Sequence, residues 1–514
     1  MEDPNDQIQQ RLRKLEELRA MGIEPYGGRF PALPLPAGQA GAGGPARPAR
    51  GEVLHKAKGL QELYVQASKE ELEQQKVPAV LAGRIMSMRH FGKACFAHLQ
   101  DDSSRIQIYF KNDILGKNAL EIFERLDLGD LIGVRGHLFR TKTDELTLLV
   151  EDLTLLAKSL RPLPEKWHGL TDIEIRYRQR YLDLIANPEM REIFRRRSRM
   201  IEAIRAFLNQ RGFLEVETPM MQAVAGGATA RPFVTHHHAL GTDLYLRIAP
   251  ELYLKRLVVG GFERVYEINR NFRNEGISTI HNPEFTMLEF YMAYSDYQDL
   301  IPFTEELITN VAREVLGTLK LNYQGHEIDL TPPWQRLNYL DAIAKHNNLD
   351  AKSIADPQQV KRLAQKLQIG VKAQDPIGKV LNEVFASTVE SHLIGPVIIM
   401  DYPTDISPLA KRKSDRPEFS ERFELYIAGR EMANAFSELN DPLDQRRRFE
   451  DQMNQRKAGD LEAHQMDEDF LRALEYGMPP AAGEGVGIDR LTMLFTNQAS
   501  IRDVILFPQM RPEK

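Results

Sequence analysis

The stretch FRNEGISTIHNPEFTMLEFYMAY, residues 272–294, mixes charged side chains with aromatic ones. If residues 263–275 form a β-strand, alternate side chains lie on opposite faces of it. One face of that strand would be polar along its length: Glu267, Asn269, Asn271, Arg273 and Glu275. In the returning run EFTMLEFYMAY, alternate positions share one face: Phe285, Glu289 and Tyr291. The stretch therefore predicts a β-hairpin, with Gly276 and Pro283 in its loop.

Such a hairpin carries groups that suit a nucleotide and an amine. The guanidinium of Arg273 can bind a phosphate, and the ring of Phe285 offers a stacking face to adenine. The carboxylates can receive a cation or an amine. The alternative is a solvated hairpin with mixed charges, which is the commoner origin of such runs. Solvated hairpins rarely segregate charges with aromatic rings in this way, so the pattern favours a binding site.

A second motif, GEGVGIDRL, covers residues 483–491. Its glycines are compatible with a dinucleotide-binding turn, but only 27 residues follow Gly487. That length does not hold a βαβ unit with its distant acidic residue. The motif instead predicts a strand that runs into a helix, with Arg490 in the first turn and able to reach a phosphate.

Composition restricts the class of protein. The chain has 514 residues, of which 42% are hydrophobic and 27% charged, so we expect a globular protein with two or more domains. Cys95 is the only cysteine, which excludes an intrachain disulfide and favours the cytoplasm. No run approaches the ~18 apolar residues of a membrane span, and we expect no membrane association. The net charge of -6 is mild, so any nucleic-acid contact must use a local basic surface.

The N-terminal part predicts a nucleic-acid-binding barrel. We expect an amphipathic helix within residues 1–25, a Gly/Pro/Ala-rich linker over 26–53, and an OB-fold over 54–158 built from short alternating strands. Three residues on these strands can stack on and hydrogen-bond to single-stranded bases: Arg89, Phe96 and Gln107. The alternative places Phe96 in the barrel core and the other two on an ordinary surface.

The remainder predicts a larger α+β domain over residues 186–514, after an interdomain linker at 159–185. Its first element is a long helix stopped by Gly212 and followed by a strand that ends at Pro219. Residues 338–392 are predominantly helical and predict a helical insertion.

These motifs, taken in order, resemble those of a known family. The helix and strand ending at Pro219, FRNE with His281 downstream, and GIDR near the C-terminus resemble the three motifs of class II aminoacyl-tRNA synthetases. Within that class, five further segments resemble bacterial lysyl-tRNA synthetases: GGATARPF, APELYLKRL, SPLAK, NAFSELNDP and RDVILFP. The resemblance covers nearly the whole chain except the linker. Two departures are Ala481, where threonine is common, and Ile280, where arginine is often found.

The resemblance implies an N-terminal OB-fold that reads the anticodon of tRNA-Lys, and a catalytic domain with an antiparallel sheet and flanking helices. It also implies a homodimer formed through the region of Pro219, and Mg²⁺ as cofactor with ATP as substrate. The implied site residues fall into four sets. ATP is bound by Arg273, Glu275, His281, Phe285 and Arg490, of which Arg273 and Arg490 are catalytic. Lysine is bound by Gly227, Glu251, Glu289, Tyr291, Asn434, Phe436 and Glu438. Magnesium is held by Glu424 and Glu431, and the anticodon by Arg89, Phe96 and Gln107.

The physical chemistry of the pocket agrees with lysine as substrate. An ammonium removed from water needs carboxylate partners, which Glu289 and Glu438 would provide. Asn434, Phe436 and Glu438 have the same parity on one strand. Glu431 has the opposite parity, so it joins the site only if a bulge or turn follows Ala428–Gly429, and the sequence leaves this open.

The implied reaction has two steps. Lysine and ATP first form lysyl-adenylate, and the lysyl group is then transferred to the 3′ end of tRNA-Lys. Neither step needs a covalent nucleophile from the protein.

Three alternatives remain. One is a paralogue that lysylates a protein, which would lack the barrel. Another is an aspartyl- or asparaginyl-tRNA synthetase, which the glutamate-rich pocket disfavours. The third is a single-strand-binding protein with an inactive catalytic domain, which the retained ATP-site residues disfavour.

Overall fold

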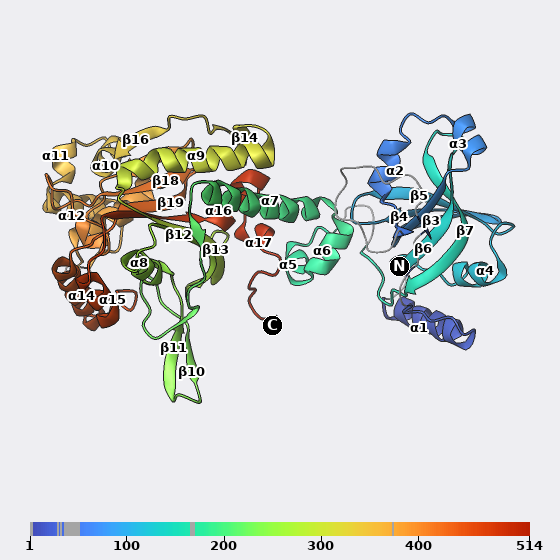
Figure 1. Ribbon diagram of the computed structural model, residues 1–514, viewed down its shortest axis with the longest axis horizontal. Coiled ribbons are helices and arrows are strands. Elements are labelled where there is room, and N and C mark those ends of the chain that lie inside the picture. The colour runs from blue at the N-terminus through green and yellow to red at the C-terminus, as the bar shows by residue number, and fades with distance from the viewer. Residues whose placement is uncertain are drawn as a thin grey trace. The chain divides into compact units, whose positions relative to one another are not determined.

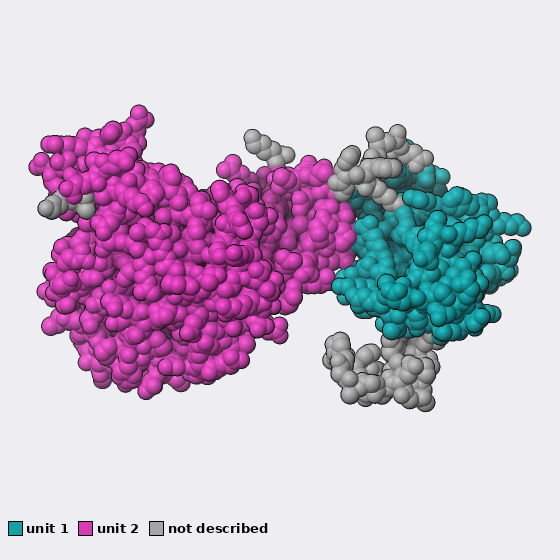
Figure 2. Space-filling view, turned by 90° about the horizontal axis from the view of Figure 1, so that it is seen from above, with its two compact units in different colours: residues 1–169 teal, residues 170–514 magenta. Residues whose placement is uncertain are grey.

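The computed structural model describes residues 4–27, 30, 33–34, 52–164, 170–372 and 375–513. The chain forms two compact units, residues 1–169 and 170–514, shown in different colours in Figure 2. Most of the predicted linker over residues 26–53 lies outside the described residues. The other domain boundaries drawn from the sequence stay predictions.

The first unit is built on a closed five-stranded barrel, in which the strand order is β3-β4-β5-β7-β6. Its strands are β3 (Pro78–Phe91), β4 (Ala94–Gln100), β5 (Arg105–Lys111), β6 (Leu131–Arg140) and β7 (Leu146–Ala157). Alternation along β4 turns Cys95, Ala97 and Leu99 into the core. Short helices accompany the barrel: α2 (Ala57–Leu63), α3 (Lys69–Gln75) and α4 (Lys117–Phe123). A two-residue pairing joins β1 (Leu33–Pro34) to β2 (Glu52–Val53).

The N-terminal helix α1 (Pro4–Ala20) forms where the 3.6-residue apolar spacing predicts it. It buries Leu15 and Leu18, and Leu18 belongs to the apolar core of the barrel. On its polar side, Arg11 donates to the carbonyl oxygens of Ser159 and Arg161 at 3.0 and 3.1 Å. The helix is therefore part of the first unit.

The second unit is organised around an eight-stranded sheet with strand order β16-β17-β18-β19-β20-β13-β12-β8 (Figure 1). The pairs at the two edges, β16–β17 and β12–β8, are parallel and the others are antiparallel. Its strands are β8 (Leu214–Glu215), β12 (Arg264–Phe272), β13 (Glu284–Ala293), β16 (Gln335–Asn338), β17 (Val397–Met400), β18 (Arg422–Ile427), β19 (Arg430–Ser437) and β20 (Ala481–Gly487). The predicted hairpin of residues 263–294 forms β13 and β12, the sixth and seventh strands in this order.

Two details of this region differ from the sequence-based expectation. Strand β12 ends at Phe272, and Arg273 and Glu275 lie just beyond it, because the Arg273 amide donates to Pro283 and the Glu275 amide donates back to Arg273. The strand before Pro219 is only two residues long. The predicted polar face of β12 is present and is buried: the carboxylate of Glu267 accepts bonds of 2.6 Å from both Arg247 and Thr218.

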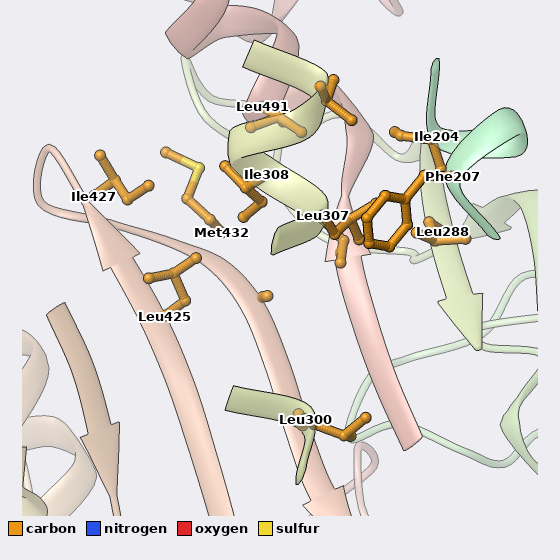
Figure 3. Close-up of a cluster of buried hydrophobic side chains, with 14 of the residues drawn as sticks. Ile204, Phe207, Leu288, Leu300, Leu307, Ile308, Leu425, Ile427, Met432 and Leu491 are labelled. Carbon is orange, nitrogen blue, oxygen red and sulfur yellow. The ribbon is translucent and has the colours of Figure 1, made fainter. Parts of the chain in front are cut away.

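Helices α7 (Glu189–Gln210), α9 (Tyr297–Leu316) and α16 (Ile488–Thr496) cover one face of the sheet and enclose the main apolar core. Figure 3 shows Phe207 of α7 and Leu307 of α9 among the buried side chains packed against Leu288 of β13. Residues of the opposite parity on β13, such as Glu289, point to the other face. That second face carries the candidate site.

The remaining elements surround this frame. The helical insertion consists of α10 (Tyr339–His346), α11 (Ala351–Ile354), α12 (Pro357–Lys366), α13 (Ile377–Thr388) and η1 (Glu390–His392), with a small core of its own. A three-stranded sheet is formed by β9 (Met221–Gln222), β10 (Val234–His237) and β11 (Thr242–Leu246), and its β10–β11 hairpin extends away from the unit (Figure 1). The other elements are α5 (Ile173–Arg178), α6 (Arg180–Ala186), α8 (Glu251–Val259), β14 (Lys320–Tyr323), β15 (His326–Asp329), η2 (Thr404–Ile406), α14 (Pro442–Lys457), α15 (Glu468–Glu475) and α17 (Ile501–Val504).

The expected α+β fold, with an OB-type barrel and an antiparallel-dominated sheet flanked by helices, is confirmed. Among the described residues, no helix is both long enough and apolar enough to cross a membrane.

Candidate active site

A cavity of about 350 Å³ opens on the face of the large sheet opposite α9. It is lined by all the residues predicted to bind ATP, lysine or magnesium except one: Gly227, Glu251, Arg273, Glu275, His281, Phe285, Glu289, Tyr291, Glu424, Glu431, Asn434, Phe436 and Arg490. Glu438 is the exception, and it lies buried behind the cavity wall. Residues from segments more than 200 positions apart therefore meet in one hollow.

Arg273 lies at the hairpin end of the cavity and is anchored through its backbone. Its guanidinium carbon is 5.0 Å from the centre of the Phe285 ring, and its buried Nε has no hydrogen-bond partner. Burial lowers the pKa of Arg273, and the neighbouring carboxylates of Glu275 and Glu431 oppose that shift. An arginine stays charged in such surroundings, so the site offers an unsatisfied cationic donor.

His281 lies in the loop of the hairpin, between β12 and β13. Its backbone amide donates to the Ser278 hydroxyl at 3.0 Å, and the Ser278 amide donates to the His281 carbonyl at 3.1 Å. Burial lowers the pKa of His281, and the positive charge of Arg490 lowers it further. The imidazole is therefore neutral at pH 7, and it can donate one hydrogen bond to an anion without adding a charge.

Arg490 lies in the first turn of α16, as the GIDR motif predicts. Its Nη1 donates to the backbone oxygen of Glu431 at 2.7 Å and pairs with the Glu431 carboxylate at 3.1 Å. Although burial raises the pKa of Glu431, Arg490 and then Arg422 outweigh it, so the net shift is downward. Glu431 is thus ionised near neutral pH.

A β-bulge settles the parity of Glu431. Tyr426 pairs with Glu431, whereas its neighbour Leu425 pairs with Ala433, so Met432 is an extra residue in β19. One extra residue reverses the alternation of side chains along the strand. Glu431 therefore reaches the same face as Asn434 and lines the cavity.

Asp489 is a residue that sequence reasoning missed, although it stands beside Arg490 in the motif. One carboxylate oxygen pairs with Arg197 of α7 at 2.6 Å, and the other accepts a 2.7 Å bond from the amide of Thr286 in β13. This carboxylate is 3% exposed. It fixes the start of α16, and with it Arg490, against the hairpin.

The other end of the cavity is acidic. The hydroxyl of Tyr291 donates to Glu289 at 2.7 Å. Burial raises the pKa of Glu289 to about 8, with a further upward contribution from Glu251. Gly227, with φ +86°, lies so close to Glu251 and Ala249 that a Cβ there would be 2.9 Å from the Glu251 Cβ.

Two carboxylates on neighbouring strands are candidates for holding a metal. Glu424 accepts bonds from the hydroxyls of Tyr402 and Tyr426 at 2.8 and 2.6 Å, and it pairs with Arg422 at 2.5 Å. Arg422 also lines the cavity and donates to Asn434 at 3.0 Å, and it was missed because only tertiary packing brings it there. Within the described ranges, no cluster of three or more His, Cys, Asp or Glu side chains suits a metal ion.

The barrel gathers its three predicted base-binding residues on one outer face. Arg89 pairs across the strands with Phe96, and the Phe96 ring stacks on Tyr109 at 4.4 Å between centroids. Gln107 donates to Glu145 at 2.8 Å. Phe96 lies outside the barrel core, which contains its neighbours Cys95 and Ala97, so the alternative that placed Phe96 in the core is wrong. Tyr109 was missed, although strand pairing places it beside Phe96.

Comparison with known proteins matches both units. The family described as tRNA synthetases class II (D, K and N) matches residues 172–511, and the OB-fold nucleic acid binding domain matches residues 79–156. The lysine–tRNA ligase of Pelotomaculum thermopropionicum is 56% identical over 515 residues, covering 100% of this chain and 96% of its own. That of Carboxydothermus hydrogenoformans is 57% identical over 508 residues, covering 99% and 98%. That of Bacillus subtilis is 51% identical over 510 residues, covering 99% and 98%.

This chain is more than 50% identical to these lysine–tRNA ligases over nearly its full length. The two matching family models agree with the cavity and the barrel surface described above. The resemblance noted from the motifs is confirmed. The chain belongs to the lysine–tRNA ligase family of class II aminoacyl-tRNA synthetases.

Proposed function

We propose that this chain activates L-lysine with ATP and transfers the lysyl group to the 3′ end of tRNA-Lys. One observation carries the proposal: carboxylates suited to an ammonium and arginines suited to a triphosphate line the same cavity. A lysine side chain needs buried carboxylates when it leaves water. Aspartate or asparagine would need cationic or amide groups there, so the glutamates disfavour those substrates.

In the activation step, a carboxylate oxygen of lysine attacks the α-phosphorus of ATP, and the bond to pyrophosphate breaks. Arg273 neutralises the α-phosphate and orients the attacking carboxylate. Phe285 and Arg490 hold adenine between them, while Glu275 binds its edge and His281 contacts the γ-phosphate. The free Nε of Arg273 and its closeness to Phe285 support these roles.

Lysine binds at the acidic end. Gly227 and Glu251 receive its α-amino group, and the side chain extends toward Glu289, Tyr291, Asn434, Phe436 and Glu438. The hydrogen bond from Tyr291 to Glu289 supports a carboxylate held in one orientation for the ammonium.

Magnesium fits the pair Glu424 and Glu431. Mg²⁺ prefers one or two carboxylates, completed by phosphate oxygens and water, to a cage of protein ligands. When bound, the ion would supply positive charge to the phosphates of ATP. Three donors fix the Glu424 carboxylate, and the bulge turns Glu431 toward the same cavity, which supports their assignment.

The transfer step requires tRNA, and the outer face of the barrel is suited to its anticodon. Arg89, Phe96 and Gln107 offer a cation, a stacking ring and an amide to unpaired bases. This barrel disfavours the protein-lysylating alternative, which would lack it.

We also propose a homodimer in the cytoplasm. Apolar side chains near Pro219 are exposed, and they support a self-complementary interface: Leu214, Met220 and Met221. The single cysteine agrees with a reducing compartment.

The test is ATP–pyrophosphate exchange with each of the twenty amino acids, followed by charging of purified tRNAs. We expect exchange with lysine alone and transfer to tRNA-Lys. Exchange with aspartate or asparagine would overturn the substrate. Lysine-dependent exchange with transfer only to a protein would favour the paralogue, and ATP binding without any exchange would favour an inactive catalytic domain.

A further inference from the structure

Lys255 is a fully buried lysine that the proposed roles leave unused. It lies on α8, one turn after Glu251, and its side chain is 0% exposed. Its Nζ is 2.7 Å from a carboxylate oxygen of Glu251, and it forms a second, shorter ion pair with Glu438. The Phe436 ring lies on another side, 5.4 Å from Nζ to its centre. A buried ammonium is costly, and here two carboxylates and an aromatic face compensate it.

The ammonium stands behind the pocket wall and outside the cavity. Glu251 and Phe436 line the cavity, whereas Lys255 and Glu438 do not. Lys255 therefore does not occupy the space of a bound amino acid. It touches, from the rear, two of the carboxylates assigned to lysine.

Glu438 has one oxygen bound to Lys255 and one left over. Its Oε2 pairs with Lys255, and its Oε1 is buried without a hydrogen-bond partner. The neighbouring strand makes room for it with Gly483, where a Cβ would collide with both Oε1 and the Tyr291 ring. An unpartnered buried oxygen next to a cavity for an amino acid calls for a cation from that cavity.

The titratable groups around Lys255 come from four segments of the chain. Burial would lower the pKa of Lys255, but Glu251 and Glu438 outweigh it and the net shift is upward. Burial raises the pKa of Glu251 and Glu438. Glu289 and Tyr291 face the same group from β13. His464 faces it from the loop before α15, and burial lowers its pKa to about 4, with Lys255 adding to the shift. At neutral pH, Lys255 is the fixed cation of the cluster.

We propose that Lys255 is a positioning and specificity-determining residue for the amino-acid substrate. Its ammonium favours the ionised form of Glu251 and Glu438 and orients them, so that Glu251 receives an ammonium group of lysine in the cavity and Glu438 adds negative charge from behind the cavity wall. The inference rests on the proposed function, because it assigns a role within the same site. Without Lys255, the two carboxylates would take up protons, and the pocket would lose its preference for a charged side chain.

The test compares Lys255→Met with the unaltered protein in ATP–pyrophosphate exchange between pH 6.5 and 9. We expect KM for lysine to rise on the order of tenfold at pH 7, less than for loss of a charged partner in direct contact with the ligand, because Lys255 acts through the two carboxylates. KM for ATP should stay unchanged. The rise should shrink with increasing pH, because the carboxylates then ionise without help. The kcat/KM ratio of lysine to norleucine, which lacks the ε-ammonium, should fall on the order of tenfold.

The barrel provides a matched control. Lys158 is also 0% exposed, and its Nζ pairs with Asp127 at 2.5 Å and Asp130 at 2.7 Å. Lys158→Met removes the same kind of buried ammonium from the other unit, so it should lower stability without changing the exchange kinetics for lysine.

The outcomes are distinct. No lysine-dependent exchange by the unaltered protein would overturn the proposed function. Normal exchange by the unaltered protein, with the same lysine KM and norleucine ratio in Lys255→Met, would overturn only the role of Lys255. Equal losses for lysine and ATP at every pH would also overturn it, because they indicate a structural effect. If Lys255→Met does not fold, Lys255→Gln, whose amide can donate to one carboxylate, enters the same assay with the same expectations.

Discussion

Arg273 and Glu289 lie at opposite ends of the cavity, and each keeps its ionisable group available in a different way. Arg273 is held through its backbone amide, which leaves the guanidinium free for an anion. Glu289 is held through its side chain by Tyr291, and burial keeps it protonated until a cation arrives. Arg273 is charged before substrate binds and is satisfied by an anion, whereas Glu289 is neutral and becomes ionised when a cation binds beside it.

Arg273→Ala should lower the rate of lysine-dependent pyrophosphate exchange by a factor on the order of 100 or more, as for loss of one charge-stabilising donor. The reason is that no other donor replaces its guanidinium at the α-phosphate. Arg270→Ala is the matched control, because Arg270 lies near the end of β12, three residues before Arg273, but is exposed and pairs with Glu284 at 3.6 Å. Near-normal exchange in Arg273→Ala would refute the role.

Lysine binding should release a proton at pH 7 and tighten as pH rises from 6.5 to 8.5. The pKa of Glu289 is raised to about 8, so its carboxyl is mostly neutral at pH 7, and an ammonium beside it favours the ionised form. Affinity should gain up to about tenfold per pH unit below that pKa. Calorimetry in two buffers of different ionisation enthalpy measures the released proton.

Glu289→Gln should abolish both the proton release and the pH dependence. Glu284→Gln should retain them, since Glu284 lies at the start of the same strand with a carboxylate 43% exposed. A lysine affinity that is flat across this range in the unaltered protein would contradict the assignment.

Among the elements, α7, β13 and α16 meet at Asp489, whose carboxylate joins Arg197 to the amide of Thr286. The strand pair β18–β19 meets the same place through Glu431 and Arg490. The arginine proposed to cover adenine is therefore positioned by contacts from the sheet and from a helix more than 270 residues earlier in the chain.

Asp489→Asn should lower stability by about 2–3 kcal/mol, because it leaves Arg197 without its buried partner. It should also lower kcat of exchange on the order of tenfold, since a displaced α16 moves Arg490 from its working position. Urea unfolding and exchange measurements test the two effects. Asp401→Asn breaks a comparable buried pair, with Lys413 at 2.8 Å, and should cost stability alone. Equal kcat in both variants would contradict the positioning role.

The elements also show what sequence can predict. Alternation predicted the hairpin of β12 and β13 and the face shared by Phe285, Glu289 and Tyr291, and the glycine motif predicted the strand and helix around Arg490. The resemblance implied Glu431, but alternation alone left its side of the strand open, because a bulge depends on the pairing of two strands. Lys255 and Asp489 were missed for a related reason. Their partners, Glu438 and Arg197, are distant in sequence, and only the folded sheet brings them together.

For the whole molecule, two units divide the proposed work. The cavity lies within residues 170–514, and the surface suited to bases lies within residues 1–169. The residues proposed for amino-acid activation therefore all belong to the second unit, and those proposed for selection of tRNA belong to the first. The exposed apolar side chains near Pro219 belong to the second unit.

The protein should sediment as a dimer, and Met221→Glu should shift it toward monomer, because a charge would be buried in an apolar interface. Met221 is 56% exposed in the single chain. Leu443→Glu is the control, since Leu443 on α14 is 70% exposed and away from the Pro219 region in sequence. Analytical ultracentrifugation distinguishes the species. A monomeric unaltered protein would overturn the dimer.

The extra residue in β19 limits how this strand pair can be re-engineered. Deleting Met432, or adding a single residue between it and Ala433, would exchange the inward and outward sides of the strand beyond it. Deleting or inserting two residues would keep the carboxylates of Glu424 and Glu431 on their present side. A graft of β18 and β19 onto another scaffold must therefore include Met432. Without it, Glu424 and Glu431 would lie on opposite faces of the sheet.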